Sequence, residues 1–71
     1  MLQMQQYQVI ELIVDINPKL RKGMEGVILE IWDADTYEVE FVNDDGTNIE
    51  FEGMSTFTLK KTDMKPRKFS N

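Results

Sequence analysis

The sequence contains no cysteine and no histidine, and these two absences remove most catalytic and metal-binding chemistry. Without cysteine there is no thiolate nucleophile and no disulfide of the kind that braces small secreted domains. Without histidine the chain lacks the commonest general base near neutral pH and the commonest transition-metal ligand. The only serines, Ser55 and Ser70, have no imidazole to activate them. We therefore expect no enzyme activity, no cofactor, no metal and a cytoplasmic location.

Long hydrophobic runs are also missing. The longest apolar runs hold two or three residues, as at Leu12-Ile13-Val14, whereas a membrane span needs about 20. The first six residues have neither the basic start nor the apolar stretch of a signal peptide. The whole chain of 71 residues has room for one domain. We expect a soluble single domain with no membrane partner.

Basic residues are absent from the centre of the chain. No lysine or arginine occurs between Gly23 and Leu59, although the net charge of the whole chain is only −5. The same stretch holds ten carboxylates: Glu25, Glu30, Asp33, Asp35, Glu38, Glu40, Asp44, Asp45, Glu50 and Glu52. The basic residues lie on both sides of it: Lys19, Arg21 and Lys22 before, and Lys60, Lys61, Lys65, Arg67 and Lys68 after. The pattern predicts an acidic centre with basic flanks.

Short segments with period-two alternation predict about five antiparallel strands, at residues 7–14, 27–32, 36–42, 48–52 and 56–60. The cleanest alternation places Tyr37, Val39 and Phe41 on one face and Glu38 and Glu40 on the other. The same period applied to residues 27–32 places Val27, Leu29 and Ile31 inward, and Ile28, Glu30 and Trp32 outward. In the last two segments it turns Ile49, Phe51, Phe57 and Leu59 inward.

Turn signals separate these strands. Asp33 to Asp35 has the length of a hairpin connection, and Asn43-Asp44-Asp45-Gly46 is the strongest turn in the sequence. Gly23 and Gly26 predict positive φ or a close backbone approach. Residues 62–66 predict a short helical turn. We expect an all-β, small SH3-like barrel over residues 7–67, between flexible segments at 1–6 and 68–71.

The order of these features resembles a bacterial family, the domain of unknown function 4926. The resemblance covers roughly residues 7–64 and is carried by Leu20-x-x-Gly23-x-x-Gly26-Val27, Tyr37-x-Val39-Glu40-Phe41-Val42, Asp45-Gly46 and Thr58-Leu59. It implies an SH3-like barrel, similar to KOW-type modules. Members of the family look like small products encoded beside toxin-like genes, so the resemblance also implies an antitoxin or immunity role.

The predicted strands place five glutamates on one outer face, where carboxylates would be cross-strand neighbours about 5 Å apart. Such a face would attract a basic protein, for example a toxin or nuclease, and an exposed tryptophan is a frequent interface anchor. The predicted partner-binding residues are Trp32, Glu30, Glu38, Glu40, Glu50 and Glu52, with Asp33 and Asp35 at the rim. The same charges would also suit a solvated surface with no partner.

Two alternatives concern nucleic acid. Rows of carboxylates can imitate phosphates, so the chain could be a nucleic-acid mimic that inhibits a DNA-binding protein. The basic tail, Lys60 to Lys68, could instead contact RNA phosphates, as in KOW-like barrels. Because the acidic centre would repel phosphate, we do not expect nucleic acid to be the partner. The acidic turns lack the ligand spacing of a calcium loop. The oligomeric state and the identity of the partner stay open.

Overall fold

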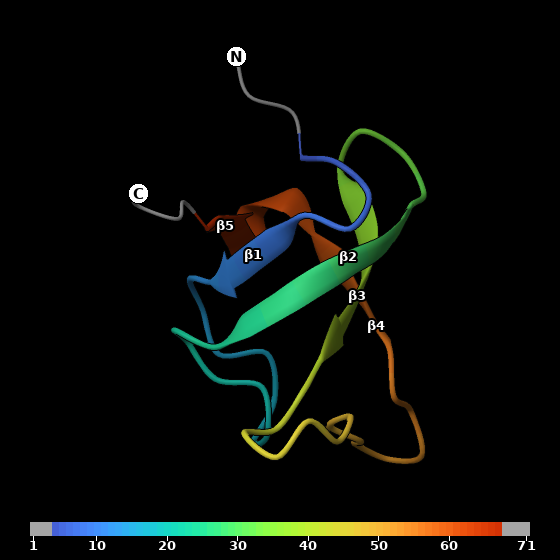
Figure 1. Cartoon of the computed structure of the whole chain (residues 1–71). Helices are drawn as coiled ribbons and strands as arrows, with labels where there is room; N and C mark the ends of the chain where they lie inside the picture. Colours follow the sequence, from blue (N-terminus) through green and yellow to red (C-terminus); the bar gives the residue numbers. More distant parts are fainter. Residues whose placement is uncertain (1–3, 68–71) are drawn as a thin grey trace, which may run out of the picture.

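The computed structural model describes residues 4–67, which form one five-stranded antiparallel sheet (Figure 1). This confirms the predicted all-β class and the short helical turn near the C-terminus. The predicted flexible segment at 68–71 lies outside the described residues, and so do residues 1–3 of the predicted flexible segment at 1–6. The elements in chain order are β1 (Val9–Leu12), β2 (Glu25–Ile31), β3 (Thr36–Phe41), β4 (Phe57–Lys60), the 3-10 turn η1 (Lys61–Asp63) and β5 (Met64–Pro66).

The sheet is not closed into a barrel, so the prediction of a closed barrel was wrong. The strand order is β4-β3-β2-β1-β5, which leaves β4 and β5 as the two edges. Both edge strands are short, β4 with four residues and β5 with three, and within residues 4–67 they do not pair with each other. The last residue of β5, Pro66, also has no N–H to donate. A single 3-10 turn, η1, therefore links the two edges.

One face of the sheet packs into a hydrophobic core. In β3, Tyr37, Val39 and Phe41 are all buried, as their alternation predicts, and Phe41 packs against Phe57 with ring centroids 6.2 Å apart. Met4, within the segment predicted to be flexible, is also buried. Each such side chain contributes about 1.5–3 kcal/mol on burial. The full core consists of Met4, Ile10, Leu12, Leu20, Ile28, Tyr37, Val39, Phe41, Ile49, Phe57, Leu59 and Met64.

The first half of β2 faces the opposite way from the prediction. Ile28 is fully buried and pairs with Val39, whereas Val27 pairs with Glu40 on the outer face. The register then shifts between Ile28 and Glu30, which leaves Leu29 as the extra residue of a bulge. After the bulge, Glu30 lies opposite Glu38, so Glu30 does point outward, as predicted. The inward placement of Val27 and Leu29 was wrong because an uninterrupted period of two cannot include the bulge.

The predicted strand at residues 48–52 is not formed. These residues lie in a long loop, residues 42–56, with only isolated bridges between Val42 and Asn48 and between Phe51 and Met54. Ile49 is buried and anchors the loop. The backbone turns left-handed at Glu52 (φ 53°) and Gly53 (φ 80°), which ends any extended ladder after Phe51.

Gly23 and Gly26 show the two features that the sequence predicts for glycine here, a positive φ and a close backbone approach. Gly23 has φ +94°, in the left-handed region, with open space around it. A Cβ at Gly26 would lie 2.7 Å from Cε2 of Phe41, 2.8 Å from Cγ1 of Val39 and 2.9 Å from the carbonyl oxygen of Glu40. Gly26 thus allows β2 to lie directly against the buried side chains of Val39 and Phe41 on β3.

Replacing Gly26 with alanine should destabilise the fold by about 2–3 kcal/mol, because the added methyl must displace a packed ring and a backbone carbonyl. Gly23→Ala is the matched control, since it adds the same methyl in open space and has only the left-handed backbone cost of about 1–2 kcal/mol. Urea denaturation followed by circular dichroism measures both. A Gly26→Ala cost no larger than that of Gly23→Ala would contradict this account of the close approach.

Candidate functional site

Trp32 is a large exposed side chain that is nevertheless held in place. It directly follows β2, and its backbone N–H donates to the carbonyl of Thr36 at 2.9 Å, which closes the hairpin to β3. Its side chain is 59% exposed. The indole Nε1–H donates to Oε1 of Glu38 at 3.1 Å. The predicted outward position of Trp32 is therefore confirmed, and its indole is fixed by the neighbouring strand.

Glu38 accepts two further hydrogen bonds, both from hydroxyl groups. Thr58 lies directly opposite it on β4 and donates to Oε1 at 2.7 Å. Thr56 donates to Oε2 at 2.6 Å. The sequence analysis missed both threonines, because their alternation with Phe57 shows that they face outward but not which residue of β3 lies beside them.

These donors favour the ionised form of Glu38. Partial burial raises the pKa of its carboxyl, but the hydrogen bonds from Thr56, Thr58 and Trp32 lower it by more, so the pKa lies below the ordinary 4.5. Glu38 is ionised at neutral pH with both oxygens occupied by its own chain. Its carboxylate therefore positions the tryptophan, the threonines and β4 against one another.

Glu30 and Glu40 are the unpaired carboxylates of this face. Glu30 lies opposite Glu38 in the β2–β3 ladder, and Glu40 is two residues further along β3. Within residues 4–67 neither side chain makes a hydrogen bond or an ion pair. The structure thus brings Glu30, Glu38 and Glu40 together beside Trp32, and two of these three charges are uncompensated.

The other predicted residues lie elsewhere. Glu50 and Glu52 are exposed in the 42–56 loop, away from the ladders, and the backbone carbonyl of Glu50 accepts from Nζ of Lys19 at 2.9 Å. Asp33 shapes the β2–β3 turn, since its Oδ1 accepts the N–H of Asp35 at 2.8 Å, and this backbone hydrogen bond lowers the pKa of Asp33. The predicted face of five glutamates is therefore divided between a sheet surface and a loop.

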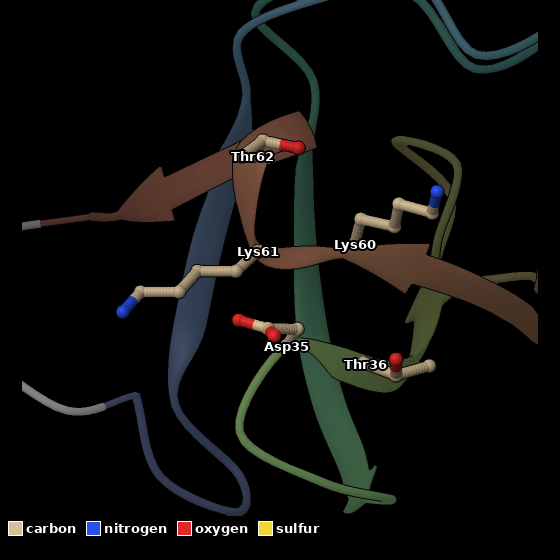
Figure 2. Close-up of a pocket in the computed structure, with 5 residues that line it drawn as sticks. All are labelled: Asp35, Thr36, Lys60, Lys61 and Thr62. Carbon is tan, nitrogen blue, oxygen red and sulfur yellow. The ribbon is translucent and has the colours of Figure 1, made fainter.

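Asp35 lines an open hollow of about 400 Å³ with Thr36, Lys60, Lys61 and Thr62, between the β2–β3 turn and η1 (Figure 2). The backbone N–H of Lys61 donates to the carbonyl of Asp35 at 2.8 Å. Figure 2 shows the side chains of Lys60 and Lys61 pointing to opposite sides, so their ammonium groups do not converge on one ligand. This hollow is therefore a gap between two turns and does not have the converging ammonium groups of an anion site.

Arg67, from the predicted basic tail, folds back onto the sheet. Its Nη1 lies 3.8 Å from Oε1 of Glu11 and also forms an ion pair with Glu25, which faces Glu11 across the β1–β2 ladder. Arg67 thus balances the carboxylates at one end of the outer face. Lys68, predicted with it, lies outside the described residues.

Over residues 4–67 no group of three or more acidic side chains is arranged to hold a metal ion. The described part of the chain also contains no helix long and apolar enough to cross a membrane.

The sequence of the chain matches that of a known family over residues 6–61, from before β1 to the first residue of η1. The chain belongs to the family described as domain of unknown function (DUF4926). This confirms the resemblance predicted from the glycine pair and the central strand. A search of the curated proteins and a search of the solved structures found no match. The DUF4926 match includes Trp32, Glu38, Thr56 and Thr58, whereas Arg67 lies beyond it.

Glu38→Gln should lower the stability of this DUF4926 domain by about 1–2 kcal/mol at pH 7, because charge-assisted hydrogen bonds are replaced by weaker neutral ones. Since folding lowers the pKa of Glu38, its contribution is present above about pH 4.5 and is lost as the pH falls through the folded-state value. The difference in the free energy of unfolding between wild type and Glu38→Gln should therefore become smaller below about pH 4.5.

Urea denaturation measures the free energy of unfolding of both proteins from about pH 3 to about pH 7, a range that brackets the ordinary glutamate pKa. Glu40→Gln is the control, since it removes the same charge from the same strand without breaking a hydrogen bond. Parallel pH profiles for the two variants would show that Glu38 has no special role.

Proposed function

We propose that this DUF4926 domain is a protein-binding module that docks onto a basic partner through the outer face around Trp32. The observation that carries the proposal is the tryptophan itself, which is 59% exposed and yet hydrogen-bonded to Glu38. Exposed tryptophans are costly to leave in water and are enriched among the residues that dominate binding energy. The indole also keeps an apolar surface available while its polar atom is satisfied.

Fixing the indole before binding supports this role. A side chain that is already held in one position loses less conformational entropy when a partner covers it. Glu38 supplies that restraint from β3, and Thr56 and Thr58 in turn hold Glu38.

The charges on this face support a basic partner. Glu30 and Glu40 lie beside the ionised Glu38 without a cation of their own, so their repulsion would be relieved by a positively charged surface. Complementary charge also speeds association and disfavours acidic competitors. The absence of lysine and arginine between Gly23 and Leu59 leaves β2, β3 and the hairpin between them without a cation of their own.

We propose that the partner is a basic toxin or nuclease and that binding masks it, as the resemblance to an antitoxin or immunity protein suggests. The strand order, with η1 directly before the last strand, supports an open, SH3-like scaffold for this task. The engagement of Arg67 by Glu11 and Glu25 argues against a free basic tail that binds RNA. The lack of cysteine supports a cytoplasmic site of action.

Trp32→Ala should weaken binding of the partner by about 30-fold, the loss typical of a central interface residue. The partner is first captured from an extract of the cells that encode the protein and identified by mass spectrometry, and affinity is then measured by calorimetry. Met54→Ala is the matched control, because Met54 is 53% exposed in the 42–56 loop, away from this face. An equal effect of both variants would rule out Trp32 as the anchor.

Charge reversal of Glu30 and Glu40 to lysine should slow association by about tenfold or more and flatten its dependence on salt. The control reverses Glu50 and Glu52, which changes the net charge equally but on the loop. Stopped-flow kinetics over a range of ionic strengths compares the two double variants. Identical kinetics would mean that net charge alone, and not the sheet face, directs the encounter. Displacement of the chain by free DNA would favour a nucleic-acid mimic instead.

A further inference from the structure

The outer face of the sheet also contains a small hollow with an apolar floor. It has a volume of about 120 Å³ and is lined by Val9, Glu25, Gly26, Val27, Glu40 and Val42. Val9, Val27 and Glu40 lie in one row across β1, β2 and β3, since Val9 pairs with Val27 and Val27 pairs with Glu40. None of these residues except Glu40 belongs to the surface assigned above to the partner.

The hollow follows from the packing of the other face. Gly26 lets β2 lie close against Val39 and Phe41 of β3 on the inner face, and on the outer face it lines the hollow together with three short valines and the two glutamates. Val42, just after β3, remains 50% exposed at the border of the hollow. The sheet therefore presents three apolar side chains at this surface, of which Val9 and Val27 are half-buried and Val42 is exposed.

Of the two carboxylates that line the hollow, one is free within residues 4–67 and the other is already in an ion pair. The Glu40 carboxylate makes no hydrogen bond or ion pair within the described residues, whereas Glu25 is already paired with Arg67. Arg67 is 42% exposed in this ion pair, and its partner Glu25 lines the hollow. The chain's own arginine thus shows that a basic side chain is accepted at this edge.

The size and chemistry suit one side chain. A volume of about 120 Å³ equals the share of about four water molecules in the liquid, close to a single long side chain. Lysine has an apolar four-carbon stem that can cover valines and a compact ammonium that can reach a carboxylate. An apolar side chain would desolvate Glu40 without compensation, and an acidic one would be repelled.

We propose that this hollow receives one lysine side chain of the basic partner, with its stem on Val9, Val27 and Val42 and its ammonium at Glu40. The proposal rests on the proposed function, and it adds a specific pocket for a lysine on the same sheet face as the tryptophan anchor. A partner would then be recognised by a rigid indole contact and by one inserted basic side chain.

The probe is a synthetic peptide, acetyl-Gly-Gly-Lys-Gly-Gly-amide, titrated into protein with labelled valine methyl groups and followed by NMR. The methyl signals of Val9, Val27 and Val42 should shift with this peptide and not with the same peptide carrying acetyl-lysine. Glu40→Gln should weaken the response by about two- to fivefold, as expected for a partly exposed ion pair. Glu52→Gln, which removes the same charge on the loop, should leave it unchanged. Equal responses to both peptides, or equal losses in both variants, would overturn the proposal.

Val27→Phe fills the hollow without altering charge, and it separates this proposal from the function on which it rests. If the captured partner requires Trp32 but binds the folded Val27→Phe variant as tightly as wild type, the lysine pocket is wrong and the docking face stands. If neither Trp32→Ala nor Val27→Phe weakens binding, both proposals fail. If Val27→Phe does not fold, the Glu40→Gln titration decides.

Discussion

The pairing of β2 with β3 is the constraint on which the rest of this small fold depends. Before the bulge at Leu29, this ladder places Gly26 and Ile28 against Phe41 and Val39 and so forms the middle of the core. After the bulge, the same strand turns Glu30 outward, opposite Glu38, and delivers Trp32 to the outer surface. One extra residue therefore lets a single strand contribute to the core at one end and to the candidate docking face at the other.

Glu38 resolves a conflict that the acidic composition creates. A row of carboxylates on adjacent strands is destabilising unless some charge is balanced or hydrogen-bonded. Within residues 4–67 no ion pair involves Glu38, which is stabilised instead by neutral donors: Thr58 of β4, Thr56 just before β4, and Trp32 of the β2–β3 hairpin. Arg67 performs the balancing role at the other end of the face, on Glu11 and Glu25. Within residues 4–67, Glu30 and Glu40 make no hydrogen bond or ion pair, and this is why we propose a basic partner for the face around them.

The two parts of the candidate interface have different physical characters. Trp32 offers a large, rigid, apolar surface that protrudes, whereas the valine hollow is a recess beside a free carboxylate. A protrusion and a recess on one sheet face restrict how a partner can be oriented, and the acidic surroundings restrict its charge. Affinity would come mainly from covering the indole, and specificity from what enters the recess.

The sequence by itself determined the all-β class, the family, the Asn43–Gly46 turn, the inward face of β3 and the need for glycine at Gly23 and Gly26. All of these depend on alternation or backbone conformation within a few neighbouring residues. It could not determine the bulge at Leu29, the loss of a strand at residues 48–52, the open sheet, or the bonds from Thr56 and Thr58 to Glu38. Those features are set by register between strands distant in the chain, and a shift of one residue in register exchanges the two faces without changing the local pattern. Only the tertiary structure could therefore decide which glutamates stand beside Trp32 and which lie on a separate loop.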